Sequence, residues 1–457
     1  MWKRVLLSVL LIVVVVGGLS FGASRLFSSQ YHILLAAQQN NEITIVNPDE
    51  EDSLENLAAE AEQALKQSSS REDDAFENTA VGNTNGSYTV EASASAKSVS
   101  TSDAATIYAK NLVSDMTLSE KICQMLIVTP EVLTGYSRVI QTGNVSKNAY
   151  SKYPVGGLVY NSQNLSSQSQ AQEMLEGLQS YALEATGLGL FFAVTEEGAD
   201  NAVCASNLGT TMFDSMRSIG ETRNSGLAYE VGSTQSAELT ALGFNVNFAP
   251  DADVLTNDAN TTIANRSFGS ESDDVSEMVS QVVYGLTSGG MLSCTKYFPG
   301  IGSSGSSWYN GYNSTDITYE ELQETDLLPF QAAIDAGTPM IMVSDVLYTK
   351  LDEDNPACLS PAIVTGILRN EMGFDGIIVS SALNNAPIST YYTSANAAVQ
   401  AISAGCDMLL CVSSISSVIN AVTTAVENGT IEESQIDASC IRILSAKVRY
   451  GIIPITE

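Results

Sequence analysis

Acidic residues that could act as a general acid and a general base stand directly behind two short apolar runs of this sequence. Glu196 and Glu197 closely follow a run that ends at Val194, and Asp345 closely follows a run that ends at Val343. Carboxyl groups held in different surroundings can divide proton donation and proton acceptance between them. Acid–base chemistry on a bound substrate, such as hydrolysis, is therefore open to this chain.

The scarcity of histidine excludes several other mechanisms. The single histidine, His32, lies close behind the N-terminal apolar run, so the main part of the chain has no imidazole for a Ser-His-Asp triad or a metal site. Asp251, Asp253 and Asp258 are close in sequence, but their spacing lacks the pattern of an EF-hand calcium loop. The seven cysteines are scattered through apolar segments, which favours buried thiols over zinc ligands or disulfides. We expect no metal ion.

The overall charge excludes a further class of partner. The chain of 457 residues has 52 acidic and 20 basic residues and a net charge of −32. A polyanionic nucleic acid is therefore not expected as a ligand. No G-x-G-x-x-G motif follows an apolar run and no phosphate-binding loop occurs, so we expect no nucleotide cofactor either.

Eight short apolar runs from about residue 105 onward predict the elements that must position these groups. The runs alternate with longer helical or loop segments, as in a parallel α/β sheet. Eight strand-helix units predict a (β/α)8 barrel of the TIM type, although the pattern alone also allows an open doubly wound sheet. The runs end at Val128, Tyr160, Val194, Ala249, Phe298, Val343, Val379 and Val412.

Polar residues or glycine follow each run. In a TIM-type barrel these residues gather at the mouth, the rim formed by the carboxyl ends of the strands, where active sites lie. Four of the intervening segments have helical periodicity, and Ser360-Pro361 is typical of a helix start. The four segments are 169–186, 274–289, 319–337 and 360–373.

The first 104 residues differ in composition from the rest. Residues 5–23 form an uncharged apolar run behind two basic residues, long enough to cross a bilayer, and the positive-inside rule places the remainder outside the cytoplasm. We predict a single-pass membrane anchor over 1–24, with a cleaved signal peptide and a secreted protein as the alternative. Residues 25–104 are rich in acidic residues and serine and are predicted to form a disordered tether. The barrel is predicted over 105–457.

Nine phrases between about Asp115 and Leu410 form a recognisable set, among them LFFAVTEEGAD, NRSFGS, TKYFPGIG and DLLPFQAAIDAG. In order and spacing they resemble the N-terminal barrel of glycoside hydrolase family 3, most closely its β-N-acetylhexosaminidase branch. The resemblance implies a (β/α)8 fold. It also implies removal of N-acetylglucosamine from cell-wall fragments by a retaining mechanism, in which an aspartate attacks the sugar and forms a glycosyl-enzyme intermediate.

The catalytic residues that this resemblance implies are substituted. Ser381 stands where the family has its aspartate nucleophile. The branch uses an aspartate-histidine pair as acid/base on the loop behind the TKYFPGIG phrase, and an ungapped comparison puts Ser307 and Tyr309 at those positions. A serine without a neighbouring base cannot form the usual glycosyl ester, and an ordinary tyrosine titrates too high to move protons at neutral pH. We therefore predict that no catalytic residue of the family is intact.

The sugar-binding positions implied by the resemblance are partly retained. Arg266 and Lys296 match the family. By contrast, Thr195 replaces an aspartate, Tyr297 replaces a histidine and Asp200 replaces an arginine. The two cations could bind sugar hydroxyl groups, an acetamido group or a carboxylate. They could equally hold the loops together by pairing with aspartates that follow neighbouring runs.

Relocated carboxylates are an alternative source of activity, and the candidates are Glu196, Glu197 and Asp345. Under the resemblance, however, Glu197 matches a family glutamate that is not the catalytic acid, and Asp345 replaces a residue that is often histidine. The larger β-glucosidases of the family take an acid/base from an additional C-terminal domain. We expect no room for such a domain before Glu457.

Three hypotheses for the function follow. The first is a membrane-tethered extracytoplasmic barrel that has lost hydrolysis, a pseudoenzyme, and that binds a cell-wall glycan, a muropeptide or a partner protein. The second is a structural or interaction protein with a vestigial pocket. The third is an active glycosidase that cleaves N-acetylglucosaminides with relocated carboxylates. Sugar binding without turnover would support the pseudoenzyme. Binding of a partner protein without sugar binding would support the structural or interaction protein, and turnover would support the active glycosidase.

Overall fold

The computed structural model of the chain describes residues 33–35, 44–46, 104–305 and 313–454. It has two compact units, and in the first, Met1–Ala92, strands β1 (Ile33–Leu35) and β2 (Thr44–Val46) pair antiparallel. This small sheet departs from the structureless tether predicted for 25–104. The anchor predicted over 1–24 lies outside the described residues. Among the residues that are described, no helix is both long and apolar enough to span a bilayer.

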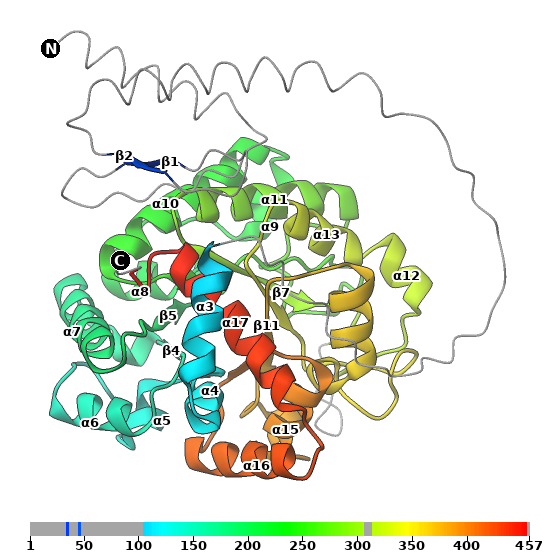
Figure 1. Cartoon of the computed structure of the whole chain (residues 1–457). Helices are drawn as coiled ribbons and strands as arrows, with labels where there is room; N and C mark the ends of the chain where they lie inside the picture. Colours follow the sequence, from blue (N-terminus) through cyan, green and yellow to red (C-terminus); the bar gives the residue numbers. More distant parts are fainter. Residues whose placement is uncertain (1–32, 36–43, 47–103, 306–312, 455–457) are drawn as a thin grey trace, which may run out of the picture. The chain divides into compact units, whose positions relative to one another are not determined.

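The second unit, Ser93–Glu457, is a closed barrel of eight parallel strands (Figure 1). Each barrel strand pairs with the next one along the chain, and the last pairs with the first. The prediction of a (β/α)8 barrel is therefore confirmed, and the open sheet was the wrong alternative. The barrel strands are β3 (Leu126–Val128), β4 (Gly157–Val159), β5 (Phe191–Val194), β6 (Val246–Asn247), β7 (Leu292–Phe298), β9 (Met340–Val343), β11 (Ile377–Ala382) and β12 (Met408–Leu410).

Nearly every residue of the barrel strands is buried, because helices cover their outer faces and side chains fill the interior. One strand is longer than predicted. The seventh run was expected to end at Val379, but β11 continues to Ala382 and includes Ser380 and Ser381. The Ser380 hydroxyl accepts a hydrogen bond from the backbone N–H of Leu410 at 3.1 Å. This bond ties the end of β11 to β12 where the main-chain register shifts.

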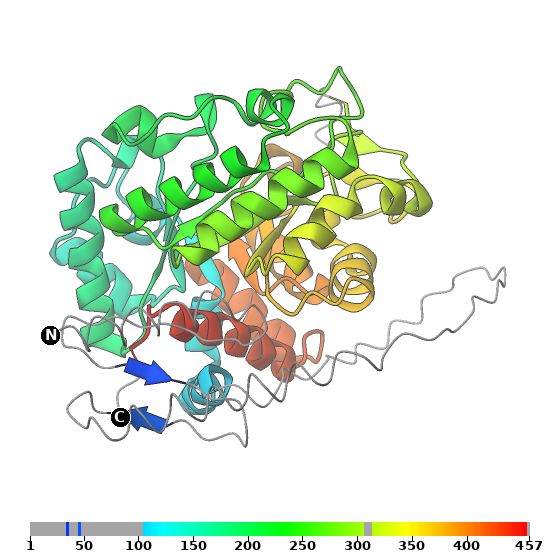
Figure 2. The same cartoon turned by 90° about the horizontal axis from the view of Figure 1, so that it is seen from above.

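Helices surround the barrel, and α10 and α11 pack side by side on its outer surface (Figure 2). The helices are α3 (Ala104–Asp115), α4 (Leu118–Gln124), α5 (Pro130–Thr134), α6 (Asn144–Lys152), α7 (Gln168–Thr186), α8 (Val203–Leu208), α9 (Met216–Glu221), α10 (Ser225–Leu242), α11 (Ser272–Ser288), α12 (Tyr319–Glu324), α13 (Leu327–Asp335), α14 (Ala386–Ser389), α15 (Ser394–Ala404), α16 (Ile415–Glu427) and α17 (Glu433–Arg449). Short helical turns and two minor strands complete the unit: η1 (Ser162–Asn164), η2 (Ala199–Asn201), η3 (Ala357–Leu359), β8 (Ser314–Thr315) and β10 (Leu347–Tyr348).

Two of the four predicted helical segments are single α-helices, α7 and α11. The segment 319–337 is instead broken into α12 and α13. Pro329 has no N–H to donate to the carbonyl of Thr325, and the Thr325 hydroxyl donates to the carbonyl of Glu321 at 2.7 Å, so the helix ends there. The segment 360–373 forms η4 (Ala362–Glu371), which has π-helical hydrogen bonding.

A buried lysine lies near the amino ends of the barrel strands. The Lys447 amine donates to Gln124 Oε1 at 2.8 Å and lies 5.1 Å from the centroid of the Phe191 ring. Its side chain is fully buried, and this burial lowers the pKa of Lys447 from 10.5 to about 7. No carboxylate pairs with this amine in the described part of the chain, so the proton is bound weakly in the folded state.

We expect the Lys447→Met variant to differ from the wild type in a pH-dependent way. Between pH 7 and 10.5 the unfolded chain holds a proton on Lys447 that the folded protein has lost, so the wild type gains stability as the pH rises. The advantage of the methionine variant should shrink by about 1.4 kcal/mol per pH unit in this window. Urea unfolding of both proteins at several pH values measures the difference. A difference that stays constant with pH would contradict the lowered pKa.

Candidate functional site

A buried cluster of ion pairs lies at the carboxyl ends of three adjacent strands. Glu197 follows β5, Arg266 follows β6 and Lys296 belongs to β7. Arg266 donates from Nε and Nη2 to the two carboxylate oxygens of Glu197 at 2.8 and 2.7 Å, and Lys296 Nζ lies 2.5 Å from Glu197 Oε1. Asp251 Oδ2 lies 3.3 Å from Arg266 Nη2. Both cations thus share Glu197, which was not among the partners expected from the sequence, and Arg266 alone also contacts an aspartate behind a neighbouring strand, Asp251.

The charges in this cluster stabilise one another. Burial alone would raise the pKa of Glu197, but the charges of Lys296 and Arg266 outweigh burial and hold this pKa at about 2. Burial acts to lower the pKa of Lys296, and the charge of Glu197 raises it above its ordinary value. Glu197 thus stays ionised over the usual pH range, which makes it a poor proton donor in acid–base chemistry.

Tyr297 completes the cluster, whereas Thr195 is at its edge. The Tyr297 hydroxyl accepts a hydrogen bond from Arg266 Nη2 at 3.0 Å, and the ring lies within cation–π distance of Arg266 and Lys296. The half-buried Thr195 ends the β5 segment, and its carbonyl accepts from the N–H of Val203 at 3.2 Å. Three of the four predicted sugar-binding residues are therefore in mutual contact.

Glu196 has a different environment from its neighbour in sequence. Its carboxylate accepts hydrogen bonds from the N–H groups of Cys204 at 2.6 Å and Ala205 at 2.9 Å, and so caps the amino end of α8. Burial raises the pKa of Glu196 to about 7, although these hydrogen bonds act to lower it. The prediction of Glu196 as an alternative acid is weakened, because its two oxygens are already used to hold a helix.

Ser381 and Asp345 contact each other across neighbouring strands. Ser381, near the end of β11, donates from its hydroxyl to Asp345 Oδ2 at 3.1 Å. Asn385 Nδ2 donates to the same oxygen at 3.2 Å. Burial raises the pKa of Asp345, and its two hydrogen bonds only partly offset this effect. A carboxylate therefore lies within hydrogen-bonding distance of Ser381, the residue predicted from the sequence resemblance to stand at the nucleophile position.

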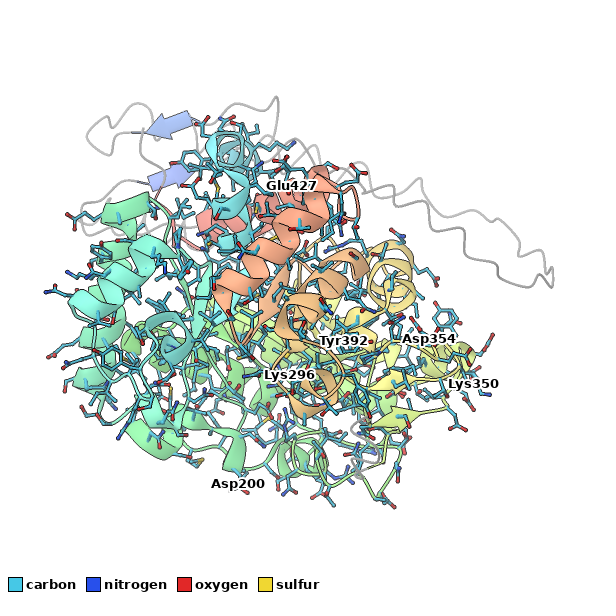
Figure 3. All side chains as sticks on the ribbon, turned by 90° about the horizontal axis from the view of Figure 1, so that it is seen from below. Asp200, Lys296, Lys350, Asp354, Tyr392 and Glu427 are labelled. Atoms are coloured by element: carbon cyan, nitrogen blue, oxygen red, sulfur yellow. The ribbon has the colours of Figure 1, made fainter. Side chains whose placement is uncertain are left out.

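The two groups of residues belong to the same mouth. Lys296 and Val379 both lie level with Met342 of β9 in the strand register, and Asp345 and Ser381 follow within a few residues. In Figure 3, Lys296 lies toward the middle of the ring of helices, and other charged residues lie nearer its edge. The ends of β5, β6, β7, β9 and β11 thus place these polar residues at the same end of the barrel.

Two buried aspartates behind the cluster hold the loop after β7. Asp253 Oδ1 accepts from the N–H of Ile301 at 2.6 Å, and Asp251 Oδ1 accepts from the N–H of Asp253 at 3.1 Å. Burial raises the pKa of both carboxyl groups. No group of three or more acidic, cysteine or histidine side chains suited to a metal ion occurs in the described ranges. Ser307 and Tyr309, the predicted acid/base positions, lie outside the described residues.

A closed (β/α)8 barrel with a charged cluster at its mouth has the architecture of a TIM-barrel enzyme. Residues 117–446 match the family described as the glycosyl hydrolase family 3 N terminal domain, and the chain belongs to this family. Its relatives place it in the β-N-acetylhexosaminidase branch, as the sequence resemblance predicted.

Three comparisons illustrate the relationship. Beta-hexosaminidase A of Pseudoalteromonas piscicida is 30% identical over 324 residues, which cover 65% of this chain and 54% of that protein. The chain thus spans about half the length of this relative. A beta-hexosaminidase of Nitrosomonas eutropha is 33% identical over 56% of this chain and 73% of its own length. The solved structure of a family 3 β-N-acetylglucosaminidase from a Paenibacillus species has a TM-score of 0.70 and 29% identity over 75% of this chain and 64% of that chain.

Proposed function

We propose that this protein binds a glycan containing N-acetylglucosamine or a derivative of it, and that it does not hydrolyse this glycan by the mechanism of its family. The observation that carries the proposal is the hydrogen bond of the Ser381 hydroxyl to Asp345, because Ser381 is the residue predicted to replace the family's nucleophile. A hydroxyl group cannot supply the negative charge that stabilises an oxocarbenium-like transition state. The retained pair of Arg266 and Lys296, fixed by Glu197, supports a site that is still ordered for a sugar.

We further propose that the barrel works at the outer surface of the cell membrane on a cell-wall glycan or a muropeptide. The apolar run over 5–23 supports an anchor, and the acidic segment behind it supports a tether that like charges keep extended. A protein partner bound at a vestigial pocket is the second candidate, which the same architecture would allow.

The first experiment is hydrolysis of a chromogenic β-N-acetylglucosaminide by the full chain. We expect no turnover above a catalytically dead family 3 relative, because the sequence resemblance predicts that both catalytic positions are substituted. The comparison variant combines Ser381→Asp, Ser307→Asp and Tyr309→His, and it should include Asp345→His. Without that last change two carboxylates would lie about 3 Å apart and could not both ionise readily.

The outcomes separate the hypotheses. Binding of an N-acetylglucosamine oligosaccharide or its de-N-acetylated form without turnover supports the proposal, and any gain of turnover in the variant strengthens it. Robust turnover by the wild type would overturn it, and Asp345→Asn would then test the remaining relocated carboxylate. Absence of sugar binding together with capture of a partner protein would favour the vestigial pocket.

A further inference from the structure

The carboxylates at the mouth are of two kinds. Glu197 is neutralised by contacts with Arg266 and Lys296, and Asp251 lies beside Arg266. Among the described residues, Asp345 accepts side-chain hydrogen bonds from the neutral donors Ser381 and Asn385, and no lysine or arginine of these residues lies within 4.0 Å of its carboxylate. The retained cations are thus paired, whereas Asp345, a partly exposed carboxylate at the same end of the barrel, has no cationic partner in the described part of the chain.

The surroundings of this carboxylate are also acidic. From residue 105 to 457 the sequence has 38 acidic and 14 basic residues, so the barrel itself carries a net charge of −24. Exposed acidic residues stand on the loops after four of the strands that form the rim, and Asp200 and Asp354 lie toward its edge in Figure 3. These loop residues are Asp200, Asp258, Asp316 and Asp354. A field of this sign attracts a cationic ligand and repels an anionic one.

From this pairing pattern we infer that the ligand of the site is a glycan whose hexosamine residues carry free, protonated amino groups, that is, a de-N-acetylated form of the glycan class proposed above. The inference rests on the proposed function, because it assumes that the mouth binds a sugar. An ammonium group would donate to Asp345 and supply the charge that no described side chain provides. An acetamido group at the same place offers only a single N–H without charge, so it lacks the ion-pair attraction that an ammonium group adds to its hydrogen bond with the carboxylate.

The expected size of the preference follows from one such contact. The acetylated sugar can also donate to this carboxylate, so the preference comes from the ion pair that only the ammonium group forms, and we expect the free-amine glycan to bind about 10-fold more tightly, which corresponds to about 1.4 kcal/mol. The preference should weaken with added salt, since part of it comes from the long-range field of the barrel. The contact with Asp345, being partly buried, should be screened less than the field.

The test is isothermal titration calorimetry of the full chain with two tetrasaccharides, one of β-1,4-linked glucosamine and one of β-1,4-linked N-acetylglucosamine. It is run at near-neutral pH and at low and high sodium chloride. Three proteins are compared: the wild type, Asp345→Asn and Asp354→Asn. The last variant is the matched control, because it removes the same charge from an exposed loop at the rim and leaves the Ser381 contact in place.

We expect the wild type and Asp354→Asn to prefer the glucosamine tetrasaccharide by about 10-fold or more, and Asp345→Asn to lose this preference. Equal or tighter binding of the acetylated sugar by the wild type would overturn the inference and leave the proposed function standing. A preference that survives Asp345→Asn and disappears at high salt would also overturn it, because the net charge alone would then be responsible. Failure of both sugars to bind would overturn the proposed function and the inference together.

Discussion

Replacing Glu197 by glutamine should lower the free energy of unfolding by about 3–5 kcal/mol, which is the usual effect of removing one partner of a buried ion pair. The glutamine keeps the size and one carbonyl oxygen of the glutamate. It leaves the buried Lys296 and the largely buried Arg266 without this partner, and Asp251, 3.3 Å from Arg266, is their remaining carboxylate neighbour among the described residues. Urea-induced unfolding at neutral pH, followed by circular dichroism, measures the loss.

The neighbouring residue provides a matched control. Glu196 is equally buried, but its carboxylate accepts only backbone N–H groups and contacts no cation in the described structure. Glu196→Gln should therefore cost no more than about 2 kcal/mol, the range of a helix-cap substitution. The double variant Glu197→Gln/Lys296→Met should recover part of the loss, because one unpaired charge is removed. Equal losses in the two single variants would contradict an ion-pair origin.

The pH dependence gives an independent check on Glu197. The folded pKa of about 2 lies below the ordinary value of 4.5, so this residue contributes stability that is fully present above about pH 5. That contribution disappears as the pH falls from 4.5 toward 2, where the carboxylate takes up a proton. The stability difference between the wild type and Glu197→Gln should accordingly narrow over this range.

The strands were predictable because the barrel buries both faces of each one. A strand that is apolar on both sides appears in the sequence as a continuous run, and runs such as MIMV before Ser344 coincide with strands of the structure. The end of β11 was not predictable in the same way. Ser380 continues the strand by bonding through its hydroxyl to Leu410, which is 30 residues away, and a pattern of apolar residues does not register such a bond.

The sequence was sufficient to identify most residues of the site, but not to predict which of them contact one another. Arg266 and Lys296 could be recognised from the family phrases, and their nearness follows from the order of the strands. The contact of Ser381 with Asp345 joins residues 36 positions apart, and it depends on the register of β9 against β11. Glu196 and Glu197 were both candidates for a relocated acid, and only the structure shows that the first caps a helix and the second joins an ion-pair cluster.

A second ion-pair network, near the amino ends of the strands, was not recognised in the sequence at all. Asp407, just before β12, accepts from Arg369 of η4 at 2.6 Å and from Arg442 of α17 at 3.0 Å. It also accepts from the Ser439 hydroxyl at 2.9 Å and from the N–H of Ile378 at 2.8 Å. A single aspartate before an apolar run is too common a pattern to indicate an ion-pair network. The two arginines are distant from Asp407 in sequence, and they come close to it only in the folded structure.

Asp407→Asn should therefore lower the free energy of unfolding by about 3–5 kcal/mol, as expected when a buried carboxylate shared by two arginines is neutralised. The amide would also direct an NH2 group toward donors that need an acceptor. Asp437→Asn is the matched control on α17. Its carboxylate pairs at 2.6 Å with Lys121, but its side chain is 39% exposed, and Lys121 keeps a second partner in Glu433.

Because the Asp437 side chain is partly exposed and Lys121 keeps Glu433 as a second partner, the control should lose no more than about 1 kcal/mol. Comparing the stability losses of the two variants shows the effect of burial, because each variant replaces one carboxylate that contacts or belongs to α17 by an amide. If both variants lost the same stability, charge alone would explain the result. Because Asp407 joins β11 to α17, its loss should also loosen β11, and faster hydrogen exchange at Ile378 in Asp407→Asn than in Asp437→Asn would show this directly.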